Sequence, residues 1–156
     1  MLDDEALARL VRKWFDRSKG GRTNLNEPHD KFICLWIAFN AWGARKTNED
    51  KDGKMIKLLK KDSELRASYE RCKKDPEFRD KVAEREGDRI YDDRYGTFVS
   101  LDDGMSFRSV LGVIYQIRCN LFHGRKVPDN VRDLELVAWA HAVLSEVFGN
   151  VVGPIS

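Results

Sequence analysis

The sequence has few cysteines and no long apolar run, and each of these scarcities excludes a class of protein. Its 3 cysteines, Cys34, Cys72 and Cys119, lie far apart and form no Cys-x-x-Cys pair, so neither a disulfide framework nor a thiol zinc site is expected. No stretch approaches the roughly 18 apolar residues of a membrane-spanning helix. Residues 1–15 are charged throughout and lack the apolar core of a signal peptide. We therefore expect reduced thiols, a cytoplasmic location and no association with a membrane.

Histidine is equally scarce, and the usual cofactor motifs are missing. The 3 histidines, His29, His123 and His141, are too far apart in sequence to show a metal-binding spacing, and no H-E-x-x-H motif occurs. The chain also lacks the G-x-x-x-x-G-K and G-x-G-x-x-G loops that hold nucleotides and the G-x-S-x-G elbow of many hydrolases. The sequence offers no candidate for a metal or cofactor site, and we expect none.

The charge of the whole chain is nearly balanced, so composition alone does not argue for binding to nucleic acid. The formal net charge is +2 over 156 residues, of which 42% are hydrophobic and 35% are charged. This composition is typical of a single folded domain with a charged exterior. Between positions 108 and 132 the single acid, Asp129, is set against these basic residues: Arg108, Arg118, Arg125, Lys126 and Arg132. A local excess of this kind is suited to a phosphate backbone.

Apolar residues recur at spacings of three and four over most of the chain, which predicts an all-α fold. We expect one domain, with a first helix over 3–19, an aromatic core helix over 29–46, a charged helical insertion over 50–86, a helix over 106–123 and a C-terminal helix over 128–148. Asp62-Ser63 and Asp75-Pro76 are expected to break the insertion into short helices, because Asp caps helices and Pro is tolerated at their first position. Periodicity is lost over 87–104, where we expect a long connection or a short strand pair. The aromatic residues of this segment favour an ordered connection that packs near the following helix.

The C-terminal helix carries two apolar stripes instead of one. The first includes Leu134, Val137 and Leu144, and the second includes Leu136 and Val143. A helix of a globular protein usually needs only one such stripe to pack against its core. The second stripe therefore predicts contact with a second subunit on the other side of the helix.

Polar residues gather at the end of the helix predicted over 106–123. Its apolar stripe runs to Leu121, but the last turn and the residues after it are polar or basic: Arg118, Asn120, His123, Gly124, Arg125 and Lys126. A histidine exchanges protons near neutral pH because its ordinary pKa is about 6.5. An arginine stays charged, and its planar guanidinium can hold two phosphate oxygens at once. These residue types together suit the cleavage of a phosphodiester.

Arg118 and His123 form an R-x4-H motif, and with this motif the sequence resembles the HEPN superfamily of helical domains. The segment FICLWIAFNAW over 32–42 is similar to the early helix of many such domains. The resemblance covers about residues 30–46 and 106–148. It implies a metal-independent endoribonuclease that acts as a homodimer. Toxins with a cognate antitoxin protein and antiviral defence effectors are the roles that this resemblance suggests. Some HEPN toxins carry a tyrosine two residues after the motif histidine, which a partner modifies; here Arg125 holds that position, so this mode of control is not expected.

The 2′-hydroxyl of RNA can attack the adjacent phosphate when a base, a cation and correct alignment are supplied. The resemblance gives His123 the role of general base or acid and Arg118 the role of stabilising the phosphate. Asn120 would orient one of these side chains or the RNA. The candidates for binding RNA are Arg125, Lys126 and Asn40. No metal ion is needed for this reaction.

Helix geometry and ordinary structural roles leave alternatives open. On an ideal helix Arg118 and His123 lie about 140° apart, so either the helix end unwinds or the ends of two subunits meet at a twofold axis, as the resemblance favours. In purely structural terms, His123 suits the negative end of a helix dipole, Arg118 suits an ion pair, and Asn40 suits a hydrogen bond to backbone. A non-catalytic HEPN-like module that binds a nucleotide, RNA or a protein, or a purely structural helical protein, would account for the same residues.

Overall fold

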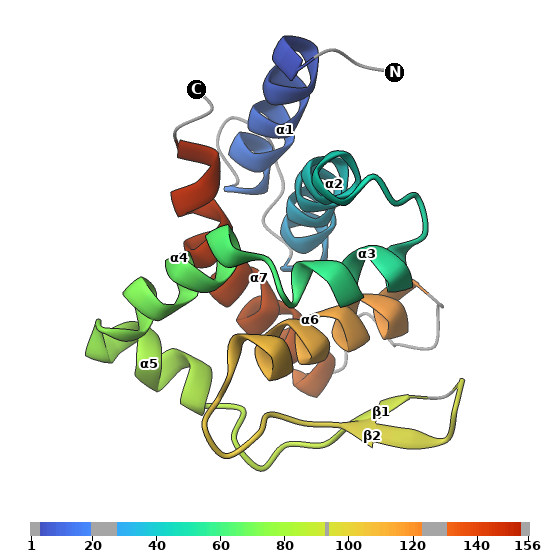
Figure 1. The fold of residues 1–156 in the computed structure, drawn as a ribbon. Coiled ribbons are helices and arrows are strands. Elements are labelled where there is room, and N and C mark those ends of the chain that lie inside the picture. Colours follow the sequence, from blue (N-terminus) through green and yellow to red (C-terminus); the bar gives the residue numbers. More distant parts are fainter. Residues whose placement is uncertain (1–3, 20–27, 93, 123–130, 154–156) are drawn as a thin grey trace.

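A computed structural model describes residues 4–19, 28–92, 94–122 and 131–153, which form helices and one small hairpin (Figure 1). The prediction of an all-α fold is confirmed, because the only strands among these residues are two short antiparallel ones. The elements are α1 (Asp4–Ser18), α2 (Pro28–Thr47), α3 (Asp52–Leu59), α4 (Ser63–Lys73), α5 (Pro76–Ala83), β1 (Ile90–Asp92), β2 (Thr97–Val99), α6 (Phe107–Phe122) and α7 (Val131–Val152).

Helix α7 is the element around which the other helices pack. The Phe148 ring lies edge-on to rings of α1 and α2, with centroids 5.8 Å from Phe15 and 5.2 Å from Phe39. Ser68 of α4 donates a hydrogen bond of 2.6 Å to the carbonyl of Val147. Both apolar stripes of α7 are therefore covered within the chain, and the described part of α7 keeps no continuous apolar face for a second subunit. The reason for expecting a partner at this helix is removed.

The aromatic segment of α2 is buried, as its sequence predicts. Phe32 and Phe39 are fully inaccessible, and Trp36 and Trp42 are nearly so. Their rings follow one another along the helix, with centroids 5.4 Å apart for Trp36 and Phe39 and 6.1 Å apart for Phe39 and Trp42. Phe39 and Trp42 also meet the Phe148 ring of α7, and these contacts join the two longest helices.

The charged segment folds as α3, α4 and α5, and its helix breaks are local in origin. Asp62 accepts a hydrogen bond from the Leu65 amide at 2.9 Å, and Asp75 accepts one from the Glu77 amide at 3.1 Å. Both carboxylates thereby satisfy amides that a helix N-terminus leaves unpaired. Tyr69 of α4 is fully buried, which places this helix in the core and not on a projecting arm.

Strands β1 and β2 form a short antiparallel pair, which is one of the two structures that the sequence predicts for this segment. The register pairs Tyr91 with Phe98, and Gly96 takes a positive φ of 64° in the turn. Ile90 and Val99 face the helices, and Ile90 is 3% exposed. The segment is ordered and lies against the following helix α6, where Asn120 donates a hydrogen bond to the carbonyl of Tyr91. Its aliphatic face packs inward, and Tyr91 and Phe98 stand on the opposite face.

Candidate functional site

The apolar stripe of α6 determines where its polar residues point. Phe107, Leu111 and Ile114 are buried at helical spacing, and this stripe faces the core. The helix lies between α3 and the hairpin (Figure 1). Polar residues on its two flanks consequently meet these two neighbours, Arg118 on the side of α3 and Asn120 on the side of the hairpin.

Arg118 is held by a carboxylate and by aromatic rings. Its Nη2 lies 2.8 Å from Oδ2 of Asp52, the first residue of α3, and both side chains are 23% exposed. The guanidinium carbon lies 4.5 Å from the ring centroid of Phe122 and 5.7 Å from that of Trp36. Aromatic faces attract such a cation through their negative potential. The ion pair that sequence reasoning left open for Arg118 is therefore present, and the side chain is fixed in one orientation.

Tyr115 lies one turn before Arg118 and joins the same group of residues. Its ring stacks on Trp36 at a centroid distance of 6.1 Å. Burial and the neighbouring Cys119 raise the pKa of the Tyr115 hydroxyl to about 12, and nearby Asp52 adds to this rise while Arg118 opposes it. The hydroxyl is thus protonated at neutral pH and available as a hydrogen-bond donor.

Asn120 uses its amide to fasten the hairpin to α6. Its Nδ2 donates a hydrogen bond of 3.0 Å to the carbonyl of Tyr91, and its Oδ1 accepts one of 3.0 Å from Gln116 Nε2. The side chain is only 9% exposed. With both amide atoms engaged, Asn120 is better placed to position its neighbours than to contact RNA directly. Its role toward RNA stays a prediction.

Replacing Asn120 by aspartate is expected to loosen the hairpin. The variant keeps the shape of the side chain but presents a carboxylate oxygen, in place of an amide donor, to the carbonyl of Tyr91. Loss of a buried hydrogen bond should lower the free energy of unfolding by about 1–3 kcal/mol. Hydrogen exchange should rise at the amides of β1 and β2 and stay unchanged in α4, which serves as the internal control. Wild-type exchange throughout the hairpin would contradict this role.

A small cleft separates the hairpin from α6. Three hairpin residues and four residues of α6 line it: Asp92, Arg94, Tyr95, Tyr115, Gln116, Cys119 and Asn120. Because Tyr115 belongs both to this cleft and to the group around Arg118, the cleft adjoins the arginine. Burial raises the pKa of the Cys34 and Cys72 thiols, and Cys119 is itself buried. Cys34 and Cys119 are both core residues, each only 6% exposed.

The remaining predicted site residues divide into two groups. His123, Arg125 and Lys126 lie outside the described residues. Asn40 is half-buried in α2, one turn after Trp36 and so on the same side of that helix. Sequence reasoning missed Asp52 and Tyr115, the first because it stands in a run of ordinary surface charges.

Neither a metal cluster nor a membrane-spanning helix is found among the described residues. Among the described residues, no group of three or more His, Cys, Asp or Glu side chains is arranged to hold a metal ion. None of the described helices has both the length and the apolar character needed to cross a bilayer. Comparisons with protein-family models, with curated proteins and with solved structures find no match to this chain.

Proposed function

We propose that this protein is a metal-independent endoribonuclease of the HEPN type, in which Arg118 and His123 act on the phosphodiester. The observation that carries the proposal is the state of Arg118. Its guanidinium is fixed by Asp52 and by aromatic faces at the end of α6, yet its side chain remains 23% exposed. A fixed, accessible cation five residues before a histidine is what phosphate stabilisation beside a proton-transfer group requires.

The reaction uses the nucleophile that RNA already contains. His123 takes the proton of the 2′-hydroxyl, whose oxygen attacks the adjacent phosphorus while the bond to the 5′-oxygen of the next nucleotide breaks. Arg118 stabilises the negative charge that develops on the phosphate oxygens. A protonated histidine, here or in a second subunit, returns a proton to the leaving 5′-oxygen. The products are a 2′,3′-cyclic phosphate and a free 5′-hydroxyl.

The proposal includes a homodimer, in which the ends of two α6 helices meet. Two exposed apolar side chains flank residues 123–130 in the sequence: Phe122 is 41% exposed and Val131 is 68% exposed. Side chains of this kind suit an interface close to the motif. We further propose a cytoplasmic location and a toxin or defence role with a cognate antitoxin protein, as the HEPN resemblance implies.

The test is cleavage of single-stranded RNA in the presence of EDTA. The wild-type protein should generate fragments that end in a 2′,3′-cyclic phosphate, and Arg118→Ala and His123→Ala should each lower the rate by about a hundredfold or more. Circular dichroism and light scattering must show that fold and oligomeric state are unchanged. Equal residual cleavage by all three proteins would identify a contaminating nuclease and refute the proposal.

The second candidate function is a non-catalytic helical module that binds a nucleotide, RNA or a protein. The ion pair between Arg118 and Asp52 favours it, because a guanidinium already paired with a carboxylate must exchange that partner, or share it, to contact a phosphate. In the same assay this module would bind RNA without cutting it, and neither substitution would change the background rate.

A further inference from the structure

The outward face of the hairpin carries aromatic rings that the fold does not use. Tyr91 and Phe98 are cross-strand partners, so both side chains stand on one face of the strand pair. Their ring centroids lie 5.2 Å apart, and the residues are 46% and 50% exposed. On the opposite face, Ile90 and Val99 pack against the helices. The exposed pair is therefore free to contact a ligand.

The Arg89 guanidinium borders this aromatic pair, and the guanidinium of Arg132 lies at the Arg89 backbone. The Cζ of Arg89 lies 4.0 Å from the ring centroid of Phe98, and Arg132 of α7 donates a hydrogen bond of 3.2 Å to the carbonyl of Arg89. Among the described residues, no carboxylate forms an ion pair with either arginine. The nearby Asp88 is already paired with Arg85 at 3.2 Å. The face thus combines flat apolar rings with the guanidinium of Arg89.

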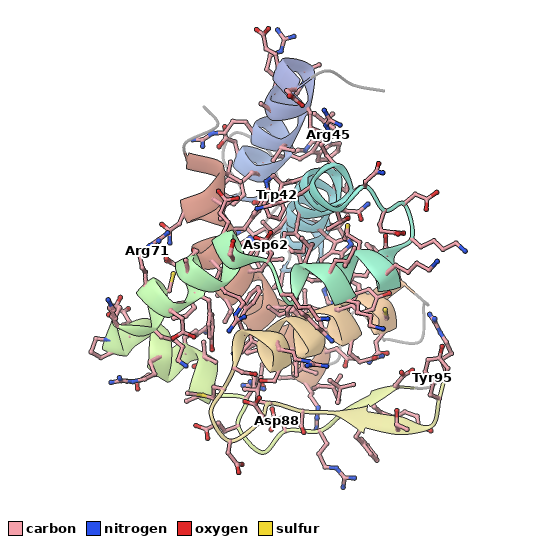
Figure 2. The ribbon with its side chains drawn as sticks, in the orientation of Figure 1. Trp42, Arg45, Asp62, Arg71, Asp88 and Tyr95 are labelled. Carbon is pink, nitrogen blue, oxygen red and sulfur yellow. The ribbon has the colours of Figure 1, made fainter. Side chains whose placement is uncertain are left out.

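A third exposed ring lies at the turn of the hairpin. Tyr95 is 72% exposed, and Figure 2 shows it at the end of the strand pair, beyond the helices. The guanidinium carbon of Arg94 lies 5.9 Å from its ring centroid. An arginine beside an exposed ring thus occurs at both ends of the hairpin, once on the outward face and once at the turn.

We propose that the outward face of the hairpin binds single-stranded RNA, with an unpaired base stacked on Tyr91 and Phe98 and the adjoining phosphates held by Arg89 and Arg132. Exposed aromatic rings accept the face of an unpaired base, which a duplex does not offer, and arginines beside them hold the backbone. A guanidinium beside exposed rings suits a ligand that offers both a flat base and a phosphate, which an apolar protein surface does not. The choice of RNA, as distinct from DNA, rests on the proposed function.

The position of the hairpin connects this surface to the motif helix. The hydrogen bond from Asn120 to the carbonyl of Tyr91 fastens the hairpin two residues after Arg118 on α6. The hairpin thus lies beside the end of α6 that carries Arg118, on the opposite flank of the helix. The hairpin would therefore select unpaired substrate near the motif helix, without itself touching the reacting phosphate.

The test measures binding with an RNA that cannot be cleaved. A fluorescein-labelled 2′-O-methyl decamer of mixed sequence is titrated with the full chain in EDTA, and its fluorescence anisotropy gives the dissociation constant. Phe98→Ala and Tyr91→Ala should each weaken binding by about tenfold or more, as expected for the loss of one stacked base. Phe98→Tyr should retain it. Leu58→Ala, at a side chain on α3 that is 47% exposed, is the matched control and should bind as the wild type does.

The outcomes separate this inference from the proposed ribonuclease activity. Because the decamer lacks a free 2′-hydroxyl, a protein that binds it but cuts no RNA would refute the activity and leave the hairpin surface standing. Wild-type affinity in Phe98→Ala and Tyr91→Ala, or no binding by the wild-type protein, would overturn the inference. So would light scattering that shows Phe98→Ala to be a monomer where the wild type is a dimer, with RNA binding unchanged, because the face would then be an interface between copies of the chain.

Discussion

Arg118→Lys should lower the rate of RNA cleavage by at least about a hundredfold while the protein stays folded. Lysine keeps the positive charge but replaces a planar group, which can hold two phosphate oxygens, by a single rotating ammonium. It also loses the flat contact that the guanidinium makes beside Phe122, where its carbon lies 4.5 Å from the ring centroid. The measurement is kcat for a short single-stranded RNA in EDTA, with circular dichroism to verify the fold.

A second arginine of the same helix provides the matched control. Arg108 lies on α6 and is exposed, far from the motif. Arg108→Lys should leave kcat within about twofold of the wild-type value, since surface charges of this kind contribute little. If Arg118→Lys cleaves at the wild-type rate, charge alone is sufficient, and the assignment of Arg118 to two phosphate oxygens is wrong.

Phe39→Ala should remove about 3–5 kcal/mol from the free energy of unfolding. Phe39 is fully buried, and its ring centroid lies 5.4 Å from that of Trp36 and 5.2 Å from that of Phe148, so it joins α2 to α7. Truncation would leave a cavity that three rings line and would break edge-to-face contacts that add to the cost. A fall of roughly 6–20 °C in Tm follows for a protein of this size.

Urea unfolding monitored by circular dichroism gives this free energy, and the midpoint should fall without a change in slope. Phe98→Ala removes the same side chain from a position that is 50% exposed, and it should cost less than about 1 kcal/mol. If Phe39→Ala and Phe98→Ala lower the free energy of unfolding equally, the burial of Phe39 does not determine the stability of the core.

The helix breaks of the charged segment could be predicted because their causes are local. Asp62 and Asp75 each bond an amide two or three residues ahead, and Pro76 occupies the first position of α5. Likewise, the burial of the α2 aromatics follows from their spacing alone. In both cases the residues that decide the structure lie within a few positions of one another.

The surroundings of Arg118 could not be predicted in this way. Asp52 comes from a different helix, and its neighbours Glu49, Asp50 and Lys51 look no different in the sequence. Only the packing of α3 against α6 selects which of these charges meets the arginine. The two exposed hairpin rings were missed for a related reason. In strands of three residues, the alternation of apolar and polar side chains is too short to show which face of the strand is buried.

The central position of α7 has a consequence for synthesis of the protein. Residues 131–152 supply the surface on which four of the other helices, α1, α2, α4 and α5, close. A nascent chain that has emerged only through α6 therefore lacks the helix that completes its interior. Its rows of exposed aromatic side chains would meanwhile invite chaperones or aggregation. We therefore expect any activity at the end of α6 to require that α7 has also left the ribosome.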